Sequence, residues 1–141
     1  MAMKNKATLT LIELSVMLAV FALAAVLCVR VFLWAEDTST AGAARDGALL
    51  QAQGAAEVLK AHGGALDEAA AVFGGTLTAQ TWTVHYNAQW EQTAAPDAYV
   101  LIARPKAQTS DLLGMADICV LRGDVCLARM EIAWQEVNGG A

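Results

Sequence analysis

The segment that decides the fold is Leu9-Thr10-Leu11-Ile12-Glu13-Leu14, which opens a long apolar run and contains the only acidic residue before Glu36. Residues 14–29 then follow without a charge, and Ser15 is the only clearly polar side chain among them. Placing a carboxylate well inside such a run costs about 2.5 to 3.5 kcal/mol for membrane insertion. We therefore expect Glu13 to pair with a positive charge, to have a function, or to lie at the headgroup interface of an ordinary signal anchor.

Charge is divided unevenly along the chain. Residues 1–34 carry three basic groups and one acidic group, whereas residues 35–141 carry the excess acid that gives the chain its net charge of −5. Lys4 and Lys6 precede the apolar run and no basic cluster follows it, so the positive-inside rule predicts a cytoplasmic N-terminus and an exported remainder. The exported part lacks the clustered Lys and Arg that bind phosphate groups, and we expect no direct nucleic-acid binding.

The apolar run is long enough to remain as a membrane anchor. A helix from Leu9 to Trp34 would measure about 39 Å, against about 30 Å for the hydrocarbon core of a bilayer. Ala22-Leu23-Ala24 has the small-x-small form of a signal-peptidase site, but apolar residues continue beyond it. We predict a single-pass protein of the cytoplasmic membrane, with a cytoplasmic leader-like segment at 1–8, a transmembrane helix at 9–34, an amphipathic helix at 35–62 and an exported domain at 63–141.

The second half of the helix has one apolar face. Its members recur at three- or four-residue spacing and are Ala41, Ala44, Ala48, Ala52, Ala55 and Leu59, widened by Leu49 and Ala56. Each glycine inside a helix costs about 1 kcal/mol relative to alanine, and the polar side chains of residues 37–40 compete for backbone hydrogen bonds. We therefore expect a bend or break between residues 36 and 42, and an end of the helix at Gly63-Gly64.

Beyond that glycine pair the pattern changes from helix to strand. Residues 66–73 are predicted to form one short helix that ends at Gly74-Gly75, and strands are predicted at 81–86, 98–104, 115–121 and 126–134, the second ended by Pro105. A sheet with one apolar face needs a cover, which the amphipathic helix provides. The predicted fold is α+β: a long N-terminal helix whose second half packs on a four-stranded antiparallel sheet.

The segment Thr8-Leu9-Thr10-Leu11-Ile12-Glu13-Leu14-Ser15 resembles the N-terminal signature of type IV pilins and of the pseudopilins of type II secretion and competence systems. There Gly precedes Phe-Thr-Leu-Ile-Glu-Leu and an apolar helix follows. The resemblance covers the leader-like segment and the apolar helix, and the rest of the chain agrees with the family in architecture only. It implies a structural subunit whose Glu13 neutralises the N-terminal amine of a neighbouring subunit in a filament. The missing Gly, the modest length and the absence of a clear cysteine-closed C-terminal loop favour a minor subunit.

The same resemblance implies a set of partners: other pilin or pseudopilin subunits, an inner-membrane assembly platform and a prepilin peptidase. The sequence departs from the signature at the processing site, because Thr8 stands in place of Gly and Leu9 in place of Phe. Cleavage after Thr8 would make Leu9 the new, methylated N-terminus, whereas cleavage after Ala7 would shift Glu13 by one place. Without cleavage Glu13 has no neighbouring amine, and the subunit could still cap or prime a filament or act as a membrane assembly factor.

Two of the three cysteines lie close in sequence around a turn signal. If the turn is centred on Arg122-Gly123, Cys119 and Cys126 stand directly opposite one another across a hairpin; if it is Gly123-Asp124, they do not. A disulfide would persist outside the cytoplasm, and two buried free thiols packing as small apolar groups are the alternative. The alternation of the last strand predicts a buried face formed by Cys126, Ala128, Met130, Ile132 and Trp134.

Other residue combinations give no reason to expect an enzyme, a metal or a cofactor. The two histidines have no metal-like neighbours in sequence, and the serines are badly placed for a Ser/His/Asp arrangement. Three acidic residues are too scattered for a calcium loop: Asp111, Asp117 and Asp124. The competing hypothesis is a membrane-anchored protein whose exported domain binds a ligand or partner without polymerising, and it predicts that Glu13 can be replaced without loss of function.

Overall fold

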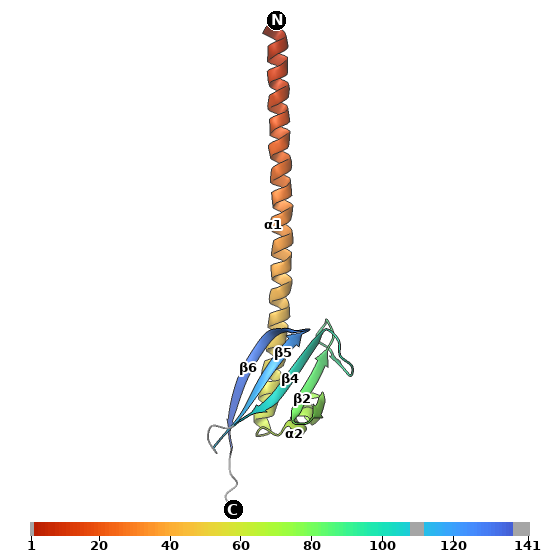
Figure 1. Ribbon diagram of the computed structural model, residues 1–141, viewed down its shortest axis with the longest axis vertical. Coiled ribbons are helices and arrows are strands. Elements are labelled where there is room, and N and C mark those ends of the chain that lie inside the picture. The colour runs from red at the N-terminus through yellow and green to blue at the C-terminus, as the bar shows by residue number, and fades with distance from the viewer. Residues whose placement is uncertain (1, 108–111, 137–141) are drawn as a thin grey trace, which may run out of the picture. The chain divides into compact units, whose positions relative to one another are not determined.

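The structure is a computed structural model that describes residues 2–107 and 112–136. Asp111, one of the three scattered acidic residues, and Ser110, one of the serines, lie outside this described part. The chain forms two compact units, Met1–Gly42 and Ala43–Ala141. The elements in chain order are α1 (Ala2–Ala61), α2 (Leu66–Phe73), β1 (Thr76–Thr78), β2 (Thr81–Tyr86), β3 (Gln92–Thr93), β4 (Tyr99–Lys106), β5 (Leu113–Arg122) and β6 (Val125–Gln135) (Figure 1).

Helix α1 is continuous from Ala2 to Ala61, so the predicted break between residues 36 and 42 is wrong. The polar side chains in this stretch bond backwards to helix carbonyls. Thr38 Oγ1 donates to the carbonyl of Trp34 (2.9 Å), and Thr40 Oγ1 donates to the carbonyl of Asp37 (3.0 Å). These bonds leave the backbone N–H groups to the helix, and the competition that the sequence suggested does not break it.

The glycine pair ends α1 as predicted. Gly63 and Gly64 have φ values of 60° and 85°, in the left-handed region that glycine adopts without a Cβ clash. The Gly64 N–H donates to the carbonyl of Leu59 (2.9 Å) and the Gly63 N–H donates to the carbonyl of Lys60 (3.1 Å). This is the paired bonding of a Schellman cap, which satisfies carbonyls that the helix end would leave unpaired. Helix α2 follows with the bounds that the sequence predicted.

The sheet is antiparallel throughout its described pairings and has six strands, in the order β1-β2-β4-β5-β6 with β3 paired to β2. The four predicted strands correspond to β2, β4, β5 and β6, so the prediction of four strands in all is wrong. Strands β1 and β3 contain three and two residues. A period of two residues cannot be recognised in segments so short.

Pro105 lies inside β4 and does not end it, in contrast to the prediction. The pairing of β2 with β4 ends at Ala103, whereas the pairing of β4 with β5 continues through Pro105 opposite Ala116 to Lys106. At Pro105 the strand therefore has a partner on one side only. Proline is tolerated at such an edge position because its missing N–H need not leave an unpaired acceptor in a neighbouring strand.

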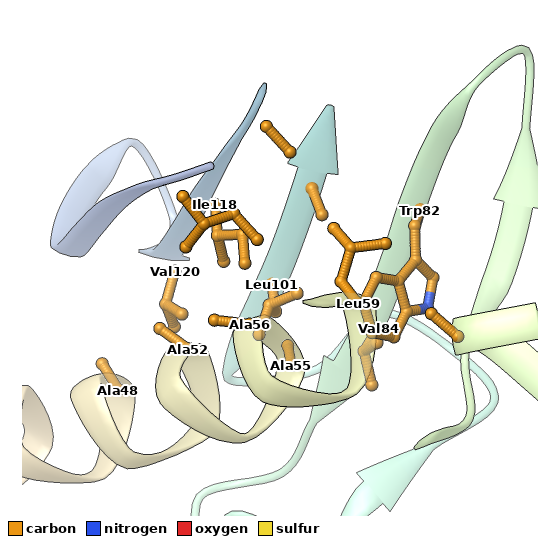
Figure 2. Packing of buried hydrophobic residues seen from close by; sticks show 14 of the residues in the cluster. Ala48, Ala52, Ala55, Ala56, Leu59, Trp82, Val84, Leu101, Ile118 and Val120 are labelled. Atoms are coloured by element: carbon orange, nitrogen blue, oxygen red, sulfur yellow. The ribbon is translucent and has the colours of Figure 1, made fainter. Parts of the chain in front are cut away.

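The core lies between the sheet and the part of α1 from Ala44 to Leu59 (Figure 2). The alanines that the sequence assigned to the apolar face are buried from Ala44 onward, with Leu59 fully buried, while Ala41 is exposed and Leu49 is 43% exposed. Small side chains on the helix let it approach the larger residues of the sheet. These include Trp82, Val84, Tyr86, Leu101, Ile118 and Val120.

Several glycines make room for aromatic rings, which the sequence alone did not indicate. A Cβ at Gly47 would lie 2.3 Å from Trp90 Nε1, and a Cβ at Gly54 would lie 3.2 Å from the Phe73 ring. The Trp90 ring stacks on Tyr99 with centroids 4.0 Å apart and an interplanar angle of 6°. Trp134 packs in the same way against Gly64 and Gly114. The cost of glycine inside a helix is thus offset by the packing of a large ring.

A β-bulge in β6 decides which side chains face the core. The turn is Gly123-Asp124, with Leu121 paired to Cys126 and Val120 paired to Ala128, so Leu127 is the extra residue. Cys126 is exposed, and its predicted burial is therefore wrong. Beyond the bulge the prediction holds in part: Ile132 is buried, and the three other members of the predicted face are half-buried or packed against the core. The bulge allows an outward Cys126 and an inward Ile132 in one strand.

Candidate functional site

Glu13 lies in the apolar part of α1, in the first of the two compact units. The side chains of residues 3–42 are exposed, and within the described residues nothing forms an ion pair or hydrogen bond with the Glu13 carboxylate. Among these residues α1 is the one helix long and apolar enough to cross a membrane, with a mean hydropathy of 2.7 over its most apolar window. The carboxylate is thus placed on the outside of a helix of membrane-spanning length, open to a group from another molecule.

Thr8 and Leu9, the residues of the predicted processing site, are both within the continuous helix. Thr8 Oγ1 donates a hydrogen bond to the carbonyl of Lys4 (2.9 Å), one turn earlier. A peptidase needs the bond between Thr8 and Leu9 in an accessible, unwound backbone. Cleavage here therefore requires the first two turns of α1 to open locally, which is a small cost because the ends of helices fray.

The outer face of the sheet, opposite α1, holds the second group of interest. Cys119 on β5 and Cys126 on β6 both belong to this face, since Cys119 lies two residues from Leu121 and Leu121 pairs with Cys126. They are diagonal neighbours and not direct partners. Both thiols are free, Cys126 is exposed and Cys119 is half-buried. Cys126 is nevertheless near enough to Cys119 to be among the groups that raise the pKa of the Cys119 thiol.

Charged groups surround Cys119 on the same face. Arg129, its direct partner in the sheet, forms a bidentate ion pair with Asp117 through Nε to Oδ1 (3.1 Å) and Nη2 to Oδ2 (2.7 Å). The pKa of the Cys119 thiol is raised to about 12, mainly by burial and also by the Cys126 thiol and the Asp117 carboxylate, while Arg129 acts in the opposite direction. Asp117 in turn raises the pKa of Arg129. At neutral pH Cys119 is therefore a protonated thiol.

A shallow hollow of about 180 Å³ opens on this face beside Cys119. It is lined by Ile102, Arg104, Asp117, Cys119 and Leu121. The sequence identified both cysteines but not their charged neighbours, because Asp117 and Arg129 come from different strands and only the register brings them together. The alternation of inward and outward side chains along β5 and β6 could have identified Asp117 and Arg129 as neighbours of Cys119. That identification requires the position of the bulge, because the bulge sets the register between the two strands.

A second hollow, of about 350 Å³, lies near β3, on the same outer face but toward the β1–β2 edge of the sheet. Its lining is uncharged and polar apart from one imidazole, and consists of Gly75, Thr76, Thr83, His85, Gln92, Thr93 and Ala94. His85 shares no metal-binding cluster with other His, Cys, Asp or Glu side chains in the described part of the chain. His62, the other histidine, lies elsewhere and places Nδ1 3.1 Å from Glu68 Oε2.

The comparisons with known proteins do not identify a relative. No protein-family model, no curated protein and no solved structure matches the chain. The function must therefore be argued from the chain's own residues, and the two places that offer an argument are Glu13 in α1 and the cysteine pair on the sheet.

Proposed function

We propose that this chain is a pilin-like or pseudopilin-like structural subunit, of the minor kind, whose N-terminal helix lies in the cytoplasmic membrane and is drawn into a filament. The observation that carries the proposal is Glu13, an isolated carboxylate within Thr10-Leu11-Ile12-Glu13-Leu14, on a helix of membrane-spanning length. The proposed work is assembly, with neighbouring subunits and an inner-membrane platform as partners, and it involves no catalysis.

The electrostatics of a buried carboxylate support an assembly role. In an apolar helix a lone carboxylate costs about 2.5 to 3.5 kcal/mol. An amine about 4 Å away would return about 4 kcal/mol at an effective dielectric constant of about 20. If a neighbouring helix slipped by one turn, about 5.4 Å, the pair would be lost and the cost would remain. A pair of this kind can therefore set the height at which one helix stacks on the next.

The fold agrees with such a role without being specific to it. The N-terminal part of α1 is long and apolar enough to cross a membrane, and its C-terminal part packs on an antiparallel sheet. In its apolar segment, the alanines at positions 19, 22, 24 and 25 would let neighbouring helices approach closely. Repeated stacking of like subunits by a rotation that does not close gives an open filament.

The first experiment replaces Glu13 with Leu in the full chain, in its own host. Because the substitution removes the insertion cost of a carboxylate, the variant is expected to reach the membrane at least as well as the parent. Assembly is expected to be lost, measured as the disappearance of cross-linked subunit ladders and of the chain from the sheared surface fraction. Glu13→Gln separates charge from shape and is expected to fail in the same way.

Ser15→Leu is the matched control, since it removes a polar side chain two residues away and leaves Glu13 in place. It is expected to assemble normally. Normal assembly of Glu13→Leu would overturn the proposal and favour a membrane-anchored protein with an exported binding domain. Loss of Glu13→Leu and Glu13→Gln from the membrane fraction would also count against it, because the proposal requires that these variants still insert into the membrane.

A second measurement addresses processing. The N-terminal residue of the membrane-recovered chain is determined by mass spectrometry, with and without the host's prepilin peptidase. A start at Leu9 or Thr8 that depends on the peptidase supports entry into a filament pathway. An intact Met1 or Ala2 start would leave Glu13 without the amine that the proposal gives it.

A further inference from the structure

We propose that Cys119 and Cys126 are a reversible dithiol-disulfide pair that links β5 to β6 on the outer face of the sheet. The inference rests on three observations that are independent of the proposed filament function. Both side chains are diagonal neighbours on the same face, both sulfurs are free, and both are open to solvent, Cys126 as an exposed residue and Cys119 through the hollow that it lines. The link would be a covalent modification of the exposed surface and not a part of the core.

The bulge at Leu127 is what makes the pair possible. With the turn at Gly123-Asp124, Cys126 pairs with Leu121, and Cys119 is its diagonal neighbour on β5. Diagonal neighbours in a regular ladder are about 7 to 8 Å apart at Cα, which is slightly beyond the usual disulfide range of about 4.4 to 6.8 Å. A bulge leaves one residue unpaired and increases the local twist, so the backbone beside Cys126 can move by the small distance that is needed.

This geometry favours a labile bond over a permanent one. A disulfide that requires a backbone shift is more easily reduced than one between ideally placed cysteines. Solvent access also favours exchange, because Cys126 is exposed and the hollow beside Cys119 opens to the surface. Arg104 and Arg129 stand on this face and would attract a small anionic disulfide such as glutathione disulfide.

The chemistry balances with a small disulfide as oxidant. The exposed Cys126 thiolate attacks one sulfur of glutathione disulfide, which breaks that S–S bond, releases one glutathione thiolate and forms a mixed disulfide. The Cys119 thiol then loses its proton to solvent and attacks the Cys126 sulfur, which forms the S–S bond between the strands and releases the second glutathione. Two electrons and two protons pass from the protein thiols to the oxidant, which leaves as two thiols.

The second step depends on the ionisation of Cys119. The charged and titratable groups around this thiol are Cys126, Asp117, Arg129 and Arg104. Burial, Cys126 and Asp117 disfavour its thiolate. Closure of the disulfide is therefore expected to be slower than formation of the mixed disulfide at neutral pH. Mass spectrometry can count both species during the reaction.

The test uses the full chain in detergent micelles with Cys28→Ser, so that only two thiols remain. The reduced protein is incubated with a glutathione redox buffer, alkylated and digested with trypsin. Arg122 lies between the two cysteines, and cleavage there puts Cys119 in peptide 107–122 and Cys126 in peptide 123–129. We expect these peptides to be joined, at the summed mass less two hydrogens, and to separate on treatment with dithiothreitol.

Single replacements supply the controls. With Cys119→Ser the protein is expected to stop at the glutathione adduct on Cys126, and with Cys126→Ser the joined peptides are expected to be absent. If the parent protein gives only glutathione adducts, or keeps two thiols that react with the alkylating agent throughout, the proposal is overturned. Disulfide-linked dimers in place of the joined peptides of one chain would overturn it equally.

Discussion

The contact between Gly47 and Trp90 allows a quantitative test of how the C-terminal part of α1 packs within the second compact unit. The change is Gly47→Ala, which adds one methyl group to the helix. Alanine is favoured over glycine in a helix interior by about 1 kcal/mol, so propensity alone predicts stabilisation. The added Cβ, however, would lie 2.3 Å from Trp90 Nε1 and 2.4 Å from Cε2, whereas heavy atoms in good contact are about 3.5 to 4.0 Å apart.

The ring must therefore move by more than about 1 Å. Overpacking of this size costs about 1 to 3 kcal/mol. Part of that cost is the stack of Trp90 on Tyr99, since ring pairs contribute about 0.5 to 1.5 kcal/mol beyond their burial. Subtracting the propensity gain leaves a net destabilisation of up to about 2 kcal/mol. Gly54→Ala is the matched control, because its Cβ would meet the Phe73 ring at 3.2 Å and requires only a small adjustment.

The assay is pulse proteolysis of the full chain in detergent across a urea series, which counts the folded fraction without an optical probe. A double-mutant cycle gives the sharper number. Trp90→Phe removes the part of the indole nearest Gly47, so in that background Gly47→Ala is expected to recover its propensity gain, with a coupling energy of about 1 to 3 kcal/mol. Equal stabilisation by Gly47→Ala and Gly54→Ala in the parent, with no coupling to position 90, would refute the reasoning.

Three further predictions follow from strain and burial. Burial raises the pKa of Tyr86 to about 12, and the nearby Gln92 side chain offsets only part of that rise, since the Tyr86 hydroxyl makes no hydrogen bond of good geometry within the described structure. The unfolded chain therefore loses this proton first as pH rises. Stability is unaffected below about pH 10 and falls by about 1.4 kcal/mol per pH unit from there to about pH 12. Tyr86→Phe should abolish that alkaline loss and be at least as stable as the parent at pH 7 by urea titration, and a destabilisation above about 1 kcal/mol would count against an unpaired hydroxyl. Ala79 and Gln80 have φ values of 46° and 64° in the turn between β1 and β2, a conformation that Asn and Gly adopt more easily. The double change Ala79→Asn with Gln80→Gly should therefore raise the free energy of unfolding by about 1 kcal/mol in the urea titration. No gain would mean that these residues adopt another turn. The pKa of Cys119 is raised to about 12, so its thiolate fraction grows tenfold for each pH unit between about pH 8 and pH 10. The rate of disulfide closure from the mixed disulfide on Cys126 should rise by the same factor, measured by mass spectrometry of samples stopped at intervals. A rate that does not change with pH would contradict the raised pKa of Cys119.

The sequence predicted the parts of the fold that depend on periodicity and on glycine. The apolar face of α1, its end at Gly63-Gly64, helix α2 and four of the six strands all come from patterns within one segment. It did not predict β1 and β3, which are too short to show a period, or the packing of Trp90 against Gly47. That packing depends on a loop residue and a helix residue far apart in sequence, and no local pattern contains it.

The candidate sites differ in how much the sequence contributed. Glu13 could be identified because a charge in an apolar run is a local anomaly, and the structure adds its place in an unbroken helix. For Thr8 and Leu9 the structure adds that the backbone is helical, so a peptidase acting at this proposed processing site would first need the helix to open locally.

The cysteine pair shows why a correct strand pattern can still give a wrong side-chain position. The alternation of β6 requires Ile132 and its even-numbered neighbours to face the core, whereas the turn at Gly123-Asp124 pairs Cys126 with Leu121 on the outer face. In a regular ladder these two requirements conflict, because a shift of one residue exchanges the faces of the whole strand. The fold satisfies both by inserting Leu127 as an unpaired residue. The same insertion places Cys126 on the face of Cys119, as its diagonal neighbour, so the core packing of β6 and the placement of the two thiols on one face have one structural cause.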